Sequence, residues 1–310
     1  MSDLRGDAMI ETLLRLLIVV NLLIVPVNSF CAEAVKLRHV VSVYTDEKGV
    51  GMKRPEGVAS DGKSLLIVAD TGNRRLLQFT FQDRDIKDGK EIKVDQLQHP
   101  IRLQLNSKGE IFVLDEKLRR VIRLSEKGVY QGYLTAEGLP SPSAFVPKSF
   151  KVDSNDTIYI LDIFSGRVLT LSPDGRYQKQ VAFPKDHGFF TDLAVDAKGT
   201  LFLIDSTKRM LFSSPKEGNS FAPLGGSLKE HLDFPGSITT DSRGTIFVVD
   251  ENGSGILVLG QDGSVLGRLL TMGWTEGLLY YPTQMCMTEK GEVFIADREN
   301  SRIQMFSAMK

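Results

Sequence analysis

The chain has 310 residues, of which 42% are apolar and 25% are charged, as in ordinary folded proteins. Its 38 Lys and Arg residues nearly balance its 39 Asp and Glu residues, so no strong field draws the chain to nucleic acid. Two cysteines exclude a disulfide framework and a thiolate metal cluster.

Residues 1–34 are predicted to be a signal peptide. Arg15 precedes an apolar run over residues 16–27, and Ala32 and Ala34 supply the small residues that signal peptidase reads. The run is about 12 residues long, and a bilayer span needs ~20. We therefore expect an exported protein of the periplasm or cell envelope, with no stable membrane span after cleavage. If the segment is not cleaved, it remains as an N-terminal anchor.

The remainder, residues 35–310, contains six internal repeats. Six short apolar runs each end in Asp, at intervals of 43–47 residues: Asp70, Asp115, Asp162, Asp205, Asp250 and Asp297. Pro stands fifteen residues before five of these aspartates, and Phe190 takes that place in the fourth repeat. Arg stands five residues after four of them. This period is typical of the four-stranded blades of a β-propeller.

The first and last repeats share a longer pattern. They read DTGNRRLLQF from Asp70 and DRENSRIQMF from Asp297. This resembles the NHL family, whose repeats carry Asp-x-x-Asn-x-Arg-aliphatic after a buried strand. The four middle repeats match in part, and the Arg is replaced by Met210 and Gly255 in two of them. The resemblance covers residues 37–310 and implies an all-β, six-bladed β-propeller of four-stranded antiparallel blades, in a bacterial exported protein.

The last repeat stops before a fourth strand, while LRHVVSVY over residues 37–44 precedes the first repeat and belongs to none. We expect this N-terminal strand to complete the last blade. An unpaired sheet edge is a liability, and a closed ring abolishes it.

The first strand of each blade should line the central channel. Alternation puts one apolar register between the blades: Val58, Leu103, Phe150, Leu193, Ile238 and Met285. The channel register is then Gly57, Arg102, Ser149, Asp192, Ser237 and Gln284, followed by Ala59, Gln104, Lys151, Ala194, Thr239 and Cys286. The recurring Asp and Arg are expected to be scaffold, as turn caps and ion pairs, because a catalytic group is needed only once.

The favoured function is a non-enzymatic binding scaffold. A small anionic or polar ligand would bind near Arg102, Lys151, Asp192 and Gln284, and a protein partner would meet the aromatic loops that carry Trp274, Tyr280, Tyr281 and Phe190. The open alternatives are that the channel charges pair with one another and with Glu56, and that the aromatic residues only cover the blade ends. No nucleic-acid partner is expected, given the near-zero charge.

The rival function is a metal-dependent lyase, or a lactonase- or esterase-type hydrolase, since some six-bladed propellers hold a divalent ion in the channel. Such a site needs converging His or carboxylate ligands. His99, His187 and His231 all fall in segments that lead into blades, on one face, but at different offsets from the Pro position. We therefore expect no bound cofactor, with a divalent metal as the alternative.

Overall fold

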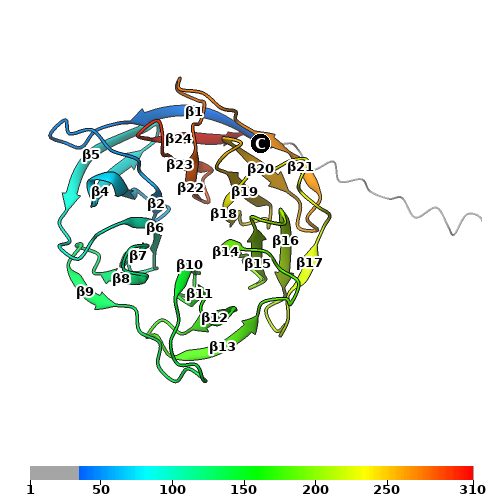
Figure 1. The fold of residues 1–310 in the computed structure, drawn as a ribbon. Coiled ribbons are helices and arrows are strands. Elements are labelled where there is room, and N and C mark those ends of the chain that lie inside the picture. Colours follow the sequence, from blue (N-terminus) through cyan, green and yellow to red (C-terminus); the bar gives the residue numbers. More distant parts are fainter. Residues whose placement is uncertain (1–34, 310) are drawn as a thin grey trace, which may run out of the picture. The chain divides into compact units, whose positions relative to one another are not determined.

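The computed structural model describes residues 35–309 as six four-stranded antiparallel sheets in a ring around a central channel (Figure 1). The only helix in this range is one 3-10 turn, Thr71–Asn73. The predicted six-bladed all-β propeller is confirmed. The signal peptide predicted over residues 1–34 lies outside the described residues. Within them, no helix has the length and hydrophobicity that a membrane span requires.

Each blade runs from a first strand at the channel to a fourth strand at the rim. Blade 1 comprises β2 (Gly57–Ser60), β3 (Leu65–Asp70), β4 (Arg75–Gln82) and β5 (Asp85–Ile92). Blade 2 comprises β6 (Pro100–Leu105), β7 (Ile111–Asp115), β8 (Arg120–Leu124) and β9 (Tyr130–Tyr133). Blade 3 comprises β10 (Pro147–Val152), β11 (Ile158–Asp162), β12 (Arg167–Leu171) and β13 (Tyr177–Ala182).

The second half of the ring repeats this order. Blade 4 comprises β14 (Phe190–Val195), β15 (Leu201–Asp205), β16 (Met210–Ser214) and β17 (Ala222–Leu224). Blade 5 comprises β18 (Pro235–Thr240), β19 (Ile246–Asp250), β20 (Gly255–Leu259) and β21 (Val265–Leu269). Blade 6 comprises β22 (Pro282–Met287), β23 (Glu292–Asp297), β24 (Arg302–Met309) and the N-terminal strand β1 (Lys36–Val43).

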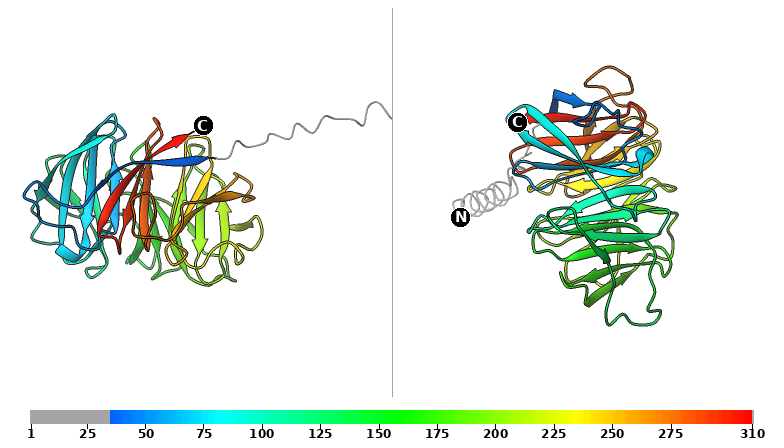
Figure 2. Two further views of the ribbon diagram at one scale, coloured as in Figure 1. Left: turned by 90° about the horizontal axis from the view of Figure 1, so that it is seen from above. Right: turned by 90° about the vertical axis from the view of Figure 1, so that its left-hand side faces the viewer.

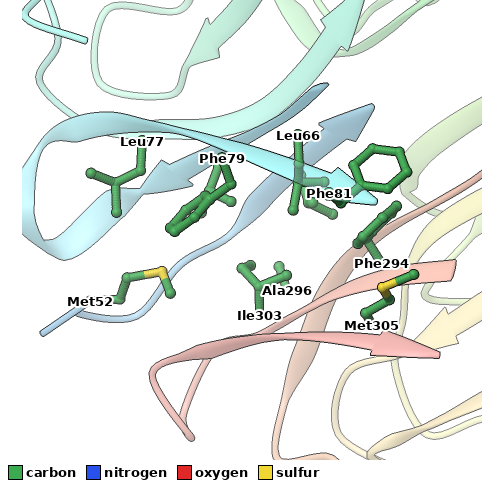
Figure 3. Close-up of a cluster of buried hydrophobic side chains, with 11 residues drawn as sticks. Met52, Leu66, Leu77, Phe79, Phe81, Phe294, Ala296, Ile303 and Met305 are labelled. Atoms are coloured by element: carbon green, nitrogen blue, oxygen red, sulfur yellow. The ribbon is translucent and has the colours of Figure 1, made fainter. Parts of the chain in front are cut away.

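The N-terminal strand closes the ring, as the sequence predicts. β1 runs antiparallel to β24, from the pair Lys36–Met309 to the pair Val43–Ile303. Figure 1 shows this blue strand beside the red one at the rim of blade 6. Valine side chains of β1 also pack on the apolar cluster between blades 6 and 1. Figure 3 shows that cluster, in which the rings of Phe81 and Phe294 lie 4.8 Å apart.

The core lies between the blades. The predicted apolar register of the six first strands is buried without exception: Val58, Leu103, Phe150, Leu193, Ile238 and Met285. Each second strand is buried along its whole length apart from its first residue in blades 1 and 6. Neighbouring blades therefore share an apolar layer, and removing apolar surface from water stabilises the ring as a unit.

A β-bulge follows the first residue of the inner strand in blades 2 to 5. In blade 2 the pairing with β7 shifts between Pro100 and Arg102, and the same shift occurs in blades 3, 4 and 5. A bulge leaves one residue unpaired and re-aims the side chains beside it. As a result, the residue directly after the Pro position lines the channel in these four blades: Ile101, Lys148, Thr191 and Gly236. Simple alternation predicts the residue two positions after the Pro instead.

The two faces of the ring differ in their connections. Successive strands are antiparallel, so the loops that lead into the first strands share a face with the turns between second and third strands. We call this the loop face, and the opposite one the turn face. Figure 2 shows the strands running between the two faces.

The recurring Asp fastens the loop face to the blades. In every blade its buried carboxylate accepts an N–H from the loop before the first strand, as in Lys53 N to Asp70 Oδ1 at 2.7 Å. The carboxylate also pairs with the Arg five residues on in blades 1, 3 and 6. In blade 5, where Gly255 replaces that Arg, Arg268 of β21 reaches Asp250 instead at 2.9 Å. These residues are scaffold, as expected.

Candidate functional site

The channel opens on the loop face into a cavity of about 270 Å³. Its walls come mainly from three recurring positions: the residues just before and just after the Pro position, and the residue just after the recurring Asp. The charged lining residues are Glu56, His99, Arg102, Glu116, Lys148, Glu251 and Arg298. Phe189 and Phe234 supply exposed aromatic rings at the rim. We call this cavity the mouth.

Arg102 forms the floor of the mouth. Its Nη1 donates to the Thr283 carbonyl at 3.2 Å, and its Nη2 donates to the Gly236 carbonyl at 2.7 Å. The side chain therefore crosses the channel from blade 2 to blades 5 and 6. Because both acceptors are neutral carbonyls, these bonds hold the guanidinium in place without neutralising its charge.

Two carboxylic acids of the mouth resist ionisation. Burial raises the pKa of Glu56 and that of Glu251, while Arg102 and Arg298 oppose the shift. Glu251 also pairs with Arg298 at 3.6 Å. The Glu116 carboxylate is more exposed and lies 3.7 Å from His99 Nε2 and 3.8 Å from Lys148 Nζ. The mouth is thus a polar chamber whose charges pair largely with one another.

Asp192 and Gln284 lie below this floor and connect blades. Asp192 accepts hydrogen bonds from the Ser149 and Ser237 hydroxyls and from the Leu193 and Ile238 N–H groups, which joins blades 3, 4 and 5. The Gln284 amide bonds the Val58 N–H and the Leu103 N–H and carbonyl, which joins blades 6, 1 and 2. Both side chains are fully buried. Asp192 and Gln284 therefore hold neighbouring blades together.

Lys151 lies at the other end of the channel. It lines a separate cavity of about 370 Å³ that opens toward the turn face, whereas Arg102 lines the mouth. The sequence predicted that Arg102 and Lys151 bind one ligand together, but the structure places them in two separate cavities. The reason is that Lys151 belongs to the second layer of channel residues, which alternation places two residues further along each inner strand than the layer of Arg102.

An aromatic series leads from the mouth out to solvent. Arg298 lies over the Tyr281 ring at 5.8 Å, Tyr281 meets Tyr280 edge-on at 5.1 Å, and Tyr280 meets Trp274 at 5.9 Å. Trp274 ends the series with 75% of its surface exposed. The three predicted aromatic residues of this loop are therefore brought together on the loop face.

Phe190 does not join them. Only 1% of its surface is exposed, because it packs against Phe183, His187 and Phe212 in the core. Its neighbour Phe189 is the exposed ring, with Lys148 at 5.7 Å from its centroid. Phe190 takes the Pro position of blade 4 and is buried in the core, so the residue before it, Phe189, lines the mouth.

The loop that carries Trp274 is held by buried polar side chains. Arg302 donates to the carbonyls of Trp274, Thr275 and Leu278 at 2.8–3.1 Å. Asn300 donates to the Gly273 carbonyl at 2.9 Å, and Asp297 Oδ2 accepts from both Asn300 and Arg302. The complete NHL pattern of the last repeat, with its Asp, Asn and Arg, thus positions this loop.

The three candidate histidines stay apart. His99 lies at the mouth beside Glu116, and His187 stacks on Phe190 with its Nδ1 bonded to the Gly188 carbonyl. His231 lies in a surface groove beside β21 with Arg268. Across residues 35–309, no three His, Cys, Asp or Glu side chains are grouped as metal ligands would be. The described residues do not fit the metal site that the enzyme alternative requires.

The fold and this mouth define a closed six-bladed propeller with a polar chamber on its loop face. An NHL-repeat profile matches residues 279–306, which cover most of blade 6. The chain is therefore a six-bladed β-propeller with an NHL repeat in blade 6. No curated protein sequence matches it.

Solved structures share the fold at low sequence identity. Virginiamycin B lyase from Staphylococcus aureus is 14% identical, with a TM-score of 0.60 over 89% of this chain and 100% of that chain. A gluconolactonase from Xanthomonas campestris is 14% identical, with a TM-score of 0.63 over 83% and 86%. A chain of a nidogen–laminin complex is 16% identical, with a TM-score of 0.58 over 76% and 92%. Two of these are enzymes and one is a protein complex, so the shared fold leaves the function open.

Proposed function

We propose that the chain is a non-enzymatic binding scaffold of the cell envelope, which binds a protein partner or a small polar ligand on its loop face. The observation that carries this proposal is Trp274, a largely exposed indole on a loop that the buried core of blade 6 holds in place. Trp is enriched among the residues that dominate binding energy at protein interfaces.

The rigidity of this loop supports binding. Ordering a loop at an interface costs free energy, so a loop that is already fixed binds more tightly for the same contacts. Arg302 and Asn300 fix four backbone carbonyls of residues 273–278 before any partner arrives. The indole ring of Trp274 projects from this fixed backbone with 75% of its surface exposed.

The mouth supplies the polar part of the same surface. The series from Trp274 through Tyr280 and Tyr281 ends at Arg298, which lines the mouth. An aromatic anchor beside a charged recess suits a protein partner that inserts a polar side chain into the channel. A small polar ligand would use the recess alone.

The test is capture of partners from an envelope extract of the source organism. The intact protein, a Trp274→Ala variant and a Tyr130→Ala variant are immobilised in parallel, and the retained proteins are identified by mass spectrometry. Tyr130 is an exposed aromatic residue on the outer strand β9, so it is the matched control. Partners retained by the Tyr130 variant and lost from the Trp274 variant support the proposal. Equal retention by both variants contradicts a protein partner that binds at Trp274.

One observation favours an enzyme at the same mouth. Glu56 and Glu251 are carboxylic acids with raised pKa values in a cleft, which is the usual environment of a general acid or base. Two of the similar folds are a lyase and a gluconolactonase. Metal analysis of the purified protein separates the metal-dependent form of this alternative: a stoichiometric divalent ion lost on His99→Ala would favour the enzyme over the scaffold.

A further inference from the structure

The cavity on the turn face is a second chamber of the channel, distinct from the mouth. It has a volume of about 370 Å³, and its polar lining includes Lys151, Gln104, Thr239 and Cys286. These residues occupy one layer of the inner strands, on blades 3, 2, 5 and 6 respectively. Ala59 and Ala194 complete the layer from blades 1 and 4, and their small side chains leave the centre open.

Lys151 is a buried cation without a carboxylate partner in this chamber. Only 8% of its surface is exposed, and within residues 35–309 its ammonium makes no ion pair or hydrogen bond. Burial lowers the pKa of Lys151, and the charge of Arg102 adds to this shift, while Asp192 and Cys286 oppose it electrostatically. Buried charges in proteins are normally paired or hydrogen-bonded, so this ammonium lacks the partner that its position calls for.

Among the described residues, none of the nearby acidic groups pairs with the Lys151 ammonium. Asp192 already accepts four hydrogen bonds from serine hydroxyls and backbone N–H groups. Burial raises the pKa of the Cys286 thiol to about 12, so the sulfur stays protonated and neutral. At the rim, one oxygen each of Asp153 and Asp196 caps the backbone of its own turn.

We infer that this chamber binds a small organic monocarboxylate, whose carboxylate pairs with the Lys151 ammonium. The side chains of Gln104 and Thr239 form no hydrogen bonds to the described protein and face the same space, so they can bond a hydroxyl or carbonyl of the ligand. This site is independent of the loop face and of the partner proposed for it.

The charge of the chamber selects a monoanion. Lys151 is the only cationic side chain among its lining residues, Asp153 and Asp196 place carboxylates at its rim, and Asp192 lies close enough to act on Lys151. A second negative charge on the ligand would meet no second cation and would be repelled by Asp192. A carboxylate therefore fits better than a phosphate dianion.

Calorimetric titration of the purified protein tests the inference, with lactate, acetate and inorganic phosphate as probes at constant ionic strength. We expect both carboxylates to bind with one-to-one stoichiometry and Lys151→Met to weaken them by about tenfold or more, the effect of losing one charged hydrogen bond. Lys108→Met removes an exposed lysine from the turn of blade 2, outside the chamber, and should leave both affinities unchanged.

The variants also guard against a trivial loss of folding. Lys151→Met removes a desolvated cation, so its melting temperature should not fall below that of the parent protein. Thr239→Val should weaken lactate, which carries a hydroxyl, more than acetate. The inference is overturned if neither carboxylate binds at tens of millimolar, if Lys151→Met binds them as well as the parent, or if phosphate binds more tightly than both.

Discussion

Replacing Arg302 by Met should destabilise the protein far more than replacing Arg120, although both hold the same position in their repeats. Arg302 is 1% exposed and bonds Asp297, the Tyr44 hydroxyl and three loop carbonyls. Arg120 is exposed, and its guanidinium lies over the Tyr133 ring at 4.9 Å. The repeat pattern alone would treat the two arginines as equivalent.

The magnitude follows from what each substitution leaves behind. Arg302→Met leaves Asp297 as a buried carboxylate without its cation, and breaking a buried pair costs about 3–5 kcal/mol. At about 2–4 °C per kcal/mol for a chain of this size, the melting temperature should fall by roughly 10 °C. Arg120→Met removes a surface side chain and should cost about 0.5 kcal/mol.

Urea unfolding followed by far-ultraviolet circular dichroism measures both costs. Trp274 is the only tryptophan, so its fluorescence anisotropy reports separately on the loop. The anisotropy should drop in the Arg302 variant, because three loop carbonyls lose their donors, and stay constant in the Arg120 variant. Equal free-energy losses in the two variants, or an unchanged anisotropy in both, would refute the assigned role of Arg302.

Three further predictions follow from the ring and the mouth. Deleting residues 35–45 removes β1 and exposes the edge of β24, so the melting temperature should fall sharply, and an unchanged value would disprove closure. Glu251→Gln should raise the melting temperature at pH 7 but not at pH 4: burial raises the pKa of Glu251, so its neutral form stabilises the fold and that stability is lost as the pH rises through the raised pKa. A gain that is equal at both pH values would contradict this. Arg268→Met should destabilise the protein by about 1.5–3 kcal/mol in urea unfolding, the loss of one charged hydrogen bond to Asp250, because Arg268 is 33% exposed and the pair is not fully buried. No loss would show that Arg268 does not replace the missing repeat Arg.

The architecture was predictable because its signals are local and repeated. The phased Pro, Asp and Arg residues mark blade boundaries, and the truncated last repeat indicates the closing strand. The inner apolar register, from Val58 to Met285, follows from alternation alone. Six copies of one pattern make each assignment support the others.

The mouth was predictable only in part, because most of its lining lies outside the channel register. Glu251, Arg298 and Lys148 line it, yet none belongs to the channel register that alternation gives. The bulge after the Pro position brings Lys148 into the channel, whereas Glu251 and Arg298 each follow the recurring Asp of their blade. No sequence pattern marks this shift, since the residues at that position differ from blade to blade.

Ion pairs and hydrogen bonds between distant residues also could not be predicted from the sequence. Arg268 reaches Asp250 from the fourth strand of its blade, and Asp192 collects hydrogen bonds from three blades. Such contacts depend on strand register and blade packing, and one sequence taken alone carries no record of them. The repeat could place Phe190 near the mouth, but not decide between it and Phe189 as the exposed ring.

Photocrosslinking in living cells tests the binding scaffold most directly. A photoreactive benzoylphenylalanine replaces Trp274 in one strain and Tyr130 in another, and the covalent adducts are identified after irradiation. The scaffold predicts a protein adduct at position 274 on the loop face and none at position 130 on the outer strand. Adducts at position 130 alone, or at neither position, would contradict it.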